Sequence, residues 1–168
     1  MFFAGFTSAG FEIILLFKLQ TELGNLYQYS ALIIALFMTG LAIGSFPFKK
    51  KQQRHYVNLL IFTLLLALSG FVITLDVNYL LGKPGLFTIY ISILTLLISA
   101  FTGSIFRYSS GLKSKIKSDS EQTLYSSDLM GGAIGSFISA LIFIPFAGIS
   151  GAAFILSGLM LVSLVALL

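Results

Sequence analysis

The sequence predicts an all-α, polytopic membrane protein built as a bundle of six transmembrane helices. Three observations indicate this class. The 168 residues are 57% hydrophobic and only 10% charged, with a mean hydropathy of +1.00, whereas a soluble domain carries roughly 25% charged residues. Apolar runs recur along the whole chain, and Lys and Arg gather in alternate connections between them. Most of the protein surface is therefore expected to face the lipid bilayer.

A helix needs about 20 mostly apolar residues to cross the hydrocarbon core of a bilayer. Six segments meet this requirement, namely 2–23, 26–46, 56–75, 86–106, 129–146 and 149–168. The last two are separated only by a turn over 145–151, which contains Gly148, so they are expected to form a tight helical hairpin. With connections this short, we expect one transmembrane domain over 1–168.

The positions of Lys and Arg predict the orientation, because cytoplasmic loops carry an excess of these residues. Four of them lie beside His55 in the second connection, and another four lie in the fourth connection, 107–127. The first, third and fifth connections together hold only Lys83. We therefore expect the second and fourth connections and both termini on the cytoplasmic side of the inner membrane.

The segment 107–127 is rich in Ser and Lys and is the longest hydrophilic stretch of the chain. One interpretation is a solvated cytoplasmic loop that touches anionic lipid head groups. The other is a docking segment for a soluble partner.

Glu12 stands about ten residues into the first span, whose run 2–17 is otherwise uncharged. A carboxylate at that depth is expensive and normally faces a bundle interior or a cavity. It either holds the bundle together through hydrogen bonds or serves as a proton, cation or substrate site. The residues that share its helical face are Gly5, Ala9, Leu16 and Gln20.

The candidate residues for contact with a solute or ion are Glu12, Gln20 and Asp128. Since Asp128 is expected where the fifth helix begins, capping of that helix N-terminus is its simpler role. Lys18 lies about 120° around the helix from Glu12, so an interfacial pair with Glu22, four residues on, is the better expectation.

Two nearly identical heptapeptides occupy 40–46 and 131–137, and both are expected at the cytoplasmic ends of their helices. Inverted three-helix repeats are common in transporters. However, the first copy closes the second helix and the other opens the fifth, so they are not equivalent points of two repeats. We interpret them as two sites of close helix approach, with mutual contact as one option. Their packing glycines are Gly40, Gly44, Gly131, Gly132 and Gly135.

Several predicted helices also carry stripes of small or hydroxyl residues on one face. Such stripes either let helices pack closely or line a polar pathway. They comprise Thr63, Ala67, Gly70 and Thr74 in the third segment, Thr88, Ser92, Thr95, Ser99 and Thr102 in the fourth, and Asp128, Gly132, Gly135 and Ser139 in the fifth.

Other functional classes find no support in the residues. There is no Cys, which excludes disulfides and thiolate metal sites, and the single His cannot form a bis-histidine haem site within this chain. No catalytic constellation or metal-ligand cluster is visible, so we expect no enzyme, cofactor or metal. The basic residues fall in the connections between spans, which argues against a nucleic-acid partner.

Two stretches resemble the membrane part of the spermidine synthase-like integral membrane proteins. The first runs from Phe3-Ala4-Gly5-Phe6 through Glu12, Gln20, Gly24 and Tyr27 to the segment 37–45, and the second is 124–135, followed by Pro145 and Gly148. The family pattern pairs an acidic residue in the first helix with a Gly-Leu-Ala-Ile-Gly-Ser type ending on the second. It also begins a later helix with Tyr-x-x-Asp-Leu-x-Gly, here 125–131.

This resemblance implies a bundle similar to half of a major-facilitator transporter. The motif positions are Glu12, Gly40, Gly44, Asp128, Gly132 and Gly135. The soluble aminopropyltransferase or methyltransferase domain often fused to these proteins has no counterpart in the sequence, so the resemblance implies no enzymatic activity here.

Two functions remain as hypotheses. The first is a non-enzymatic membrane subunit or scaffold that associates with other membrane subunits, or with a second copy, through its small-residue helix faces. The alternative is a small-molecule or ion transporter, a half-bundle working as an oligomer with Glu12 as its coupling site.

Overall fold

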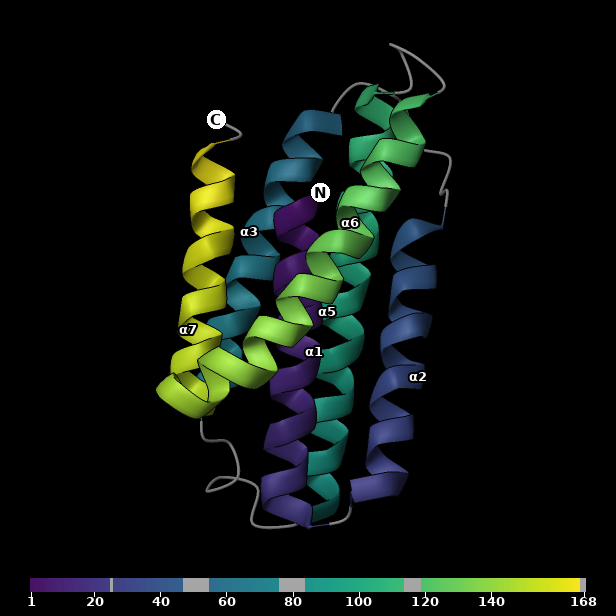
Figure 1. Ribbon diagram of the computed structural model, residues 1–168. Helices are drawn as coiled ribbons and strands as arrows, with labels where there is room; N and C mark the ends of the chain where they lie inside the picture. The colour runs from purple at the N-terminus through teal and green to yellow at the C-terminus, as the bar shows by residue number, and fades with distance from the viewer. Residues whose placement is uncertain (25, 47–54, 76–83, 114–118, 167–168) are drawn as a thin grey trace.

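The computed structural model describes residues 1–168 except 25, 47–54, 76–83, 114–118 and 167–168, and every element in these described residues is helical (Figure 1). Within the described ranges, four helices are long and apolar enough to cross a membrane, namely Phe2–Glu22, Tyr56–Thr74, Gly85–Gly111 and Gln122–Val165. A shorter apolar helix spans Tyr29–Ser45. The predicted class, an all-helical protein of several membrane-compatible helices, agrees with this finding.

The helices follow the apolar segments of the sequence, since each run supplies a continuous hydrogen-bonded backbone that hydrocarbon tolerates. Their bounds are α1 Phe2–Leu23, α2 Leu26–Ser45, α3 His55–Thr74, α5 Pro84–Lys113, α6 Asp119–Ile138, the π-helical turn η1 Ser139–Phe143 and α7 Ile144–Val165.

The prediction of a loop over 107–127 is wrong for most of its length. Helix α5 continues to Lys113 and α6 begins at Asp119, so both extend beyond the apolar runs that marked them in the sequence. The end of hydrophobicity marks where a helix leaves the membrane and does not end the helix, because Arg, Lys, Gln and Leu are good helix formers outside it.

Gly148 breaks the long apolar stretch Gln122–Val165 into two arms. Its backbone has φ 71° and ψ 177°, a conformation that only glycine adopts readily. Figure 1 shows α6 running down across the front of the bundle and α7 running back up beside α3. The predicted hairpin turn therefore lies where the sequence placed it.

The helices form two layers. Helices α1 and α5 lie side by side in the middle, α2 packs against α5, and α6 packs against α1. Helices α3 and α7 pack against each other on the left of Figure 1, α3 against α5 and α7 against α1. Helices α2 and α6, the two outer members of the row, make no contact with each other in the described part of the chain.

The main helix contacts are preserved by an exchange of α1 for α5, α2 for α6 and α3 for α7. Under this exchange the α2–α5 pair becomes α6–α1, the α3–α5 pair becomes α7–α1, and the α3–α7 pair is unchanged. In Figure 1, α2 and α5 run in the same direction, opposite to α1 and α6. The exchange therefore also reverses helix direction.

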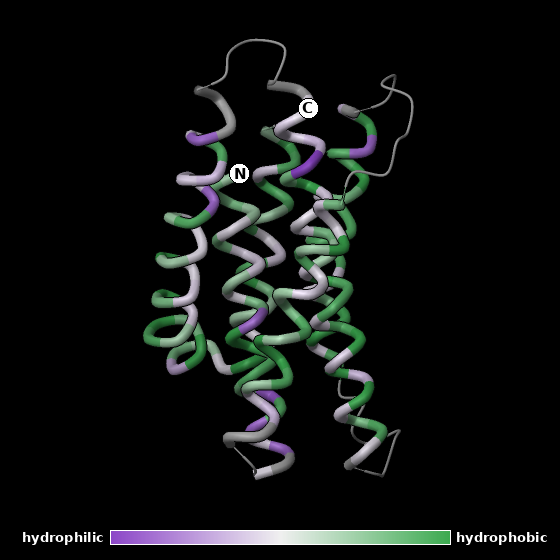
Figure 2. Tube along the Cα trace, turned by 90° about the vertical axis from the view of Figure 1, so that its right-hand side faces the viewer, coloured by the Kyte–Doolittle hydropathy of each residue, from purple (hydrophilic) through white to green (hydrophobic). Residues whose placement is uncertain are grey.

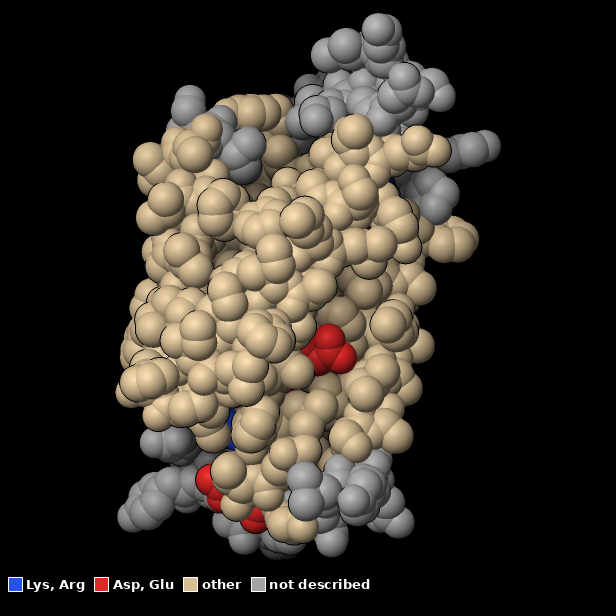
Figure 3. Space-filling model, in the orientation of Figure 1, with Lys and Arg blue, Asp and Glu red and all other residues tan. Residues whose placement is uncertain are grey.

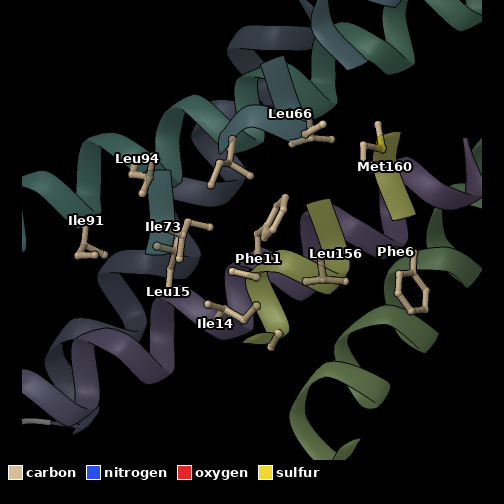
Figure 4. Packing of buried hydrophobic residues seen from close by; sticks show 14 of the residues in the cluster. Phe6, Phe11, Ile14, Leu15, Leu66, Ile73, Ile91, Leu94, Leu156 and Met160 are labelled. Atoms are coloured by element: carbon tan, nitrogen blue, oxygen red, sulfur yellow. The ribbon is translucent and has the colours of Figure 1, made fainter. Parts of the chain in front are cut away.

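The core lies between the two layers. Figure 4 shows Phe11 of α1 among side chains of α3 and α7, including Leu66 and Leu156, all of which are fully buried. Large apolar side chains such as Phe137 and Phe146, the latter 87% exposed, also cover the outside. Figure 2 shows hydrophobic residues along the length of the helices and hydrophilic ones mostly near the ends. An apolar surface of this extent is suited to lipid.

Candidate functional site

Helix α6 lies directly on the first half of α1, because glycines remove the side chains between them. A Cβ atom built on Gly131 would collide with the carbonyl oxygen of Phe2, and one on Gly135 with that of Phe6. From the other side, a Cβ on Gly5 would collide with the carbonyl oxygen of Asp128. The upper part of the α1 seam, as far as Ala9, is thus covered by α6.

Helix α2 meets α5 in the same way. A Cβ on Gly40 would collide with the Ser99 hydroxyl, and one on Gly44 with the carbonyl oxygen of Ala100. Gly103 of α5, which the sequence analysis missed, is packed against the carbonyl oxygen of Leu41. Its only sequence signal is its place one turn beyond Ser99 on the same helix.

The two heptapeptides therefore contact different helices. The segment 40–46 packs on α5, whereas 131–137 packs on α1. The option that they contact each other is wrong, because α2 and α6 lie on opposite sides of the α1–α5 row. These small-residue seams are already filled by the chain's own helices.

Below the part covered by α6, the seam of α1 opens. Glu12, Leu16 and Gln20 share this face and are all half-buried. In the described residues, the Glu12 carboxylate makes no hydrogen bond and no ion pair. A bond from this carboxylate to a neighbouring helix is thus not seen in the described residues, and its role stays a hypothesis. Figure 3 shows an acidic patch at mid-height, in a hollow of a face whose other visible charged atoms lie lower down.

In Figure 1, which has the same orientation, α1 and α5 lie beneath this hollow, between α6 and α2. We call this hollow the front groove. Its far side on α5 carries the predicted hydroxyl stripe, in which Ser99 meets Gly40 of α2 and Ser92 is half-buried. The buried hydroxyls of Thr95 and Ser99 donate to carbonyl oxygens of their own helix, those of Ile91 and Thr95, at 2.8 and 2.9 Å. The deep part of this stripe is thus satisfied and serves packing.

Asp128 lies well inside α6, which begins at Asp119, so the capping role predicted for it is wrong. The predicted start of the helix was too late, because the polar turns before Asp128 are helical as well. Its Oδ1 atom is buried without a hydrogen-bond partner among the described residues and lies against Gly5. Gly5 and Glu12 are two turns apart, about 10 Å along α1, so Asp128 and Glu12 do not form one cluster.

Ser139 resembles Asp128 in one respect. Its hydroxyl is fully buried without a partner in the described part of the chain, and it lies against Gly10 of α1. It begins the π-helical turn η1, and such turns occur often at functional sites. The sequence placed Ser139 on a polar stripe, but nothing in it predicted the π-helical turn.

Two basic side chains bind the C-terminal ends of neighbouring helices. The buried Lys18 ammonium donates to the carbonyl oxygens of Ile73 and Leu75 at the end of α3, at 2.5 and 3.1 Å. The Arg107 guanidinium donates to the carbonyl oxygen of Phe46, just past α2, at 2.9 Å. Cations are favoured at these ends because the last carbonyl groups of a helix have no partner within it. The sequence predicted only a local pair for Lys18.

Comparison with known proteins found no matching family model, no matching curated protein and no matching solved structure. No group of three or more His, Cys, Asp or Glu side chains that could hold a metal ion occurs among the described residues. The chemistry of the front groove is therefore argued from its own residues.

Proposed function

We propose that this protein is a six-span integral membrane subunit without enzymatic activity of its own, whose front groove is closed by another membrane bundle. The occupant is either a partner subunit or a second copy of the chain. The observation that carries the proposal is the Glu12 carboxylate, which lies midway along an apolar span without a partner among the described residues.

An unpaired carboxylate in the membrane is costly. Insertion scales place the cost of a charged side chain at the centre of a span at about 2.5–3.5 kcal/mol. Hydrogen bonds within the protein would offset this cost, but the described residues supply none to Glu12. A donor or cation from an occupant of the front groove would supply them, and would also exclude lipid from the half-buried Gln20 on the same face.

The proposal of six spans rests on the bend at Gly148, which divides the 44-residue stretch Gln122–Val165 into two arms, each counted as one span. With the shorter helix Tyr29–Ser45 added to the other three candidates, the count reaches six. The exchange of helix contacts described above is the pattern that inverted three-helix repeats produce, and it supports a likeness to half of a major-facilitator-type bundle.

The residues that meet the occupant differ from the glycines first expected to do so, since those are packed inside the chain. The outer face of α2 remains open, and small residues follow it at helical spacing. Ala31, Ala35, Thr39 and Ala42 are all exposed. This face points away from α5 and offers the occupant a close approach to α2.

The proposed setting is the inner membrane with both termini cytoplasmic. The ends of α2 and α5, the starts of α3 and α6, and the two termini all lie toward the same end of the bundle in Figure 1. The connections that leave from this end are the two that concentrate Lys and Arg, which favours the cytoplasmic side.

Transport is the second candidate function. Two observations favour it. Glu12 and Gln20 line the same open face, and no hydrogen bond or ion pair engages Glu12 in the described chain. Two half-bundles facing each other would then enclose a polar site at mid-membrane, where transporters bind their substrates. In that case Glu12→Gln should abolish solute binding, whereas a docking carboxyl should tolerate the amide.

A photo-crosslinking experiment tests the docking proposal. A photoreactive amino acid is placed at Leu16, on the floor of the front groove, and in a matched variant at Leu68, which is 46% exposed on α3 behind it. After irradiation of native membranes, the Leu16 variant should form a discrete protein adduct and the Leu68 variant only lipid adducts. Equal behaviour of the two variants would contradict the proposal.

Glu12→Leu separates docking from folding. Because the side chain has no hydrogen bond to lose among the described residues, the substituted chain should unfold at the same temperature as the wild type or a higher one. The crosslink from Leu16 should nevertheless weaken, because the occupant loses its carboxyl partner. Glu22→Leu, at the exposed end of α1, is the control and should leave the crosslink unchanged. A large drop in stability of Glu12→Leu would instead indicate a structural carboxyl.

A further inference from the structure

A cavity of about 250 Å³ lies among α1, α3, α5 and α7, on the other side of α1 from the front groove. Each of three helices contributes an apolar residue and a hydroxyl residue from one face. These pairs are Leu59 and Thr63 of α3, Ile105 and Ser109 of α5, and Met160 and Ser163 of α7. Residues from the start of α1 complete the wall, and neither α2 nor α6 takes part.

The cavity is partly open toward the end of the bundle where both termini lie, since Met1, Ser109 and Ala166 border it there. The inner wall is held in place by hydrogen bonds. The Met160 sulfur accepts from the hydroxyls of Thr7 and Ser163, each at 3.5 Å. Thr63 donates to the carbonyl oxygen of Leu59 at 2.8 Å.

The lining selects the chemistry of a ligand. It contains no charged side chain, and the hydroxyls of Thr63 and Ser163 already donate to their own helices. An ion would therefore find no side chain of opposite charge. An apolar cavity of about 150 Å³ in a protein stays dry and takes up small hydrocarbons. This cavity is larger, although below the range of about 300–1,000 Å³ typical of sites that enclose a whole drug-sized ligand.

We propose that this cavity binds a hydrocarbon chain, the acyl chain of a membrane lipid or of a free fatty acid, with the polar head group left outside. The chain enters from the leaflet at the end of the bundle that holds the two termini. Only part of an acyl chain fits the volume, and two of the three helix hydroxyls, those of Thr63 and Ser163, already donate to their own helices. The inference is independent of the Glu12 proposal, because it involves other helices and another side of α1.

The experiment uses the purified full chain in vesicles of phosphatidylethanolamine and phosphatidylglycerol that contain a phospholipid with a diazirine on its acyl chain. A second arm uses a free diazirine fatty acid in place of that phospholipid. After irradiation, peptides are mapped by mass spectrometry. We expect adducts concentrated on Leu59, Thr63 and Met160, and the arm that gives them identifies the source of the chain.

Two matched variants test whether the adducts require the cavity. Ser109→Phe fills it from α5, so labelling of Leu59 and Met160 should fall about tenfold. Ser110→Phe places the same ring on the neighbouring position, which does not line the cavity, and should leave labelling as in the wild type. If Ser109→Phe does not fold, Ser163→Phe fills the cavity from α7 instead.

Two results would overturn the proposal. The first is adducts spread over exposed lipid-facing residues such as Leu68 and Phe71, with none on the cavity wall in either arm. The second is cavity labelling that persists in both filled variants. The wild-type map decides the first question without any substitution.

Discussion

Lys18 is a buried cation whose ammonium group binds the end of another helix. It is only 8% exposed, and it donates to the carbonyl oxygens of Ile73, in the last turn of α3, and of Leu75, just past that helix. Arg107 makes the corresponding contact at the end of α2, but at the exposed surface. The same type of contact therefore occurs once buried and once exposed, so its contribution to the free energy of unfolding can be compared between the two settings.

We predict that Lys18→Met lowers the free energy of unfolding by about 1.5–3 kcal/mol, the range for a hydrogen bond that involves a charged group. Arg107→Met should cost less, about 1 kcal/mol or below, because water can replace the exposed guanidinium. Both can be measured by reversible unfolding in mixed micelles. A loss for Arg107→Met as large as that for Lys18→Met would show that burial does not set the strength of these contacts.

At the scale of elements, glycine decides which helices touch. Gly44 meets the backbone of α5 at Ala100, whereas Gly158 on α7 has open space where a side chain would begin. Both are helical, so alanine should favour the helix by up to about 1 kcal/mol at either position. Only at Gly44 must the added Cβ push two backbones apart.

We therefore predict opposite signs for the same substitution. Gly44→Ala should destabilise the bundle by about 1–3 kcal/mol through overpacking, and Gly135→Ala, against Phe6, should behave in the same way. Gly158→Ala should be neutral or stabilising. Thermal unfolding of the three variants in one detergent gives the comparison. Stabilisation by Gly44→Ala would mean that α2 and α5 are farther apart in the membrane.

Gly148 separates conformational strain from crowding. Like Gly158, it has open space around the position of a Cβ, but its φ is 71°. We predict that Gly148→Ala costs about 1–3 kcal/mol because the left-handed backbone is strained for any residue with a side chain. Gly158→Ala serves as the control with the same chemistry and no strain. Equal stabilities of the two variants would argue that α6 and α7 continue as one helix in the membrane.

At the scale of the whole molecule, the proposed topology places both termini and the α5–α6 end of the bundle in the cytoplasm. Ser110→Cys, near the end of α5, should resist a membrane-impermeant thiol reagent added to intact cells, and Asn78→Cys should react. Asn78 lies outside the described residues and comes four positions after Thr74, the last residue of α3, in the sequence. Since the chain has no natural cysteine, each label reports one site. The reverse pattern would overturn the orientation.

The sequence by itself determined which segments are helical and where the chain turns. Hydrophobic length, backbone hydrogen bonding and the conformational freedom of Gly148 are local properties, so α1 was predicted at 2–23 and is found at Phe2–Leu23. The same reasoning predicted the packing glycines, since a missing side chain is visible in the sequence. The same reasoning predicted too long a loop, over 107–127, because a polar segment marks the membrane boundary and does not end a helix.

Only the tertiary structure decided which helices those glycines bring together and which groups the polar side chains contact. Lys18 binds α3, Asp128 lies against Gly5, and Glu12 stays without a partner in the described chain on the floor of the front groove. Each outcome depends on how helices cross one another and on residues far away in the chain. Such long-range contacts follow from how all the helices fit together, and no single segment contains that information.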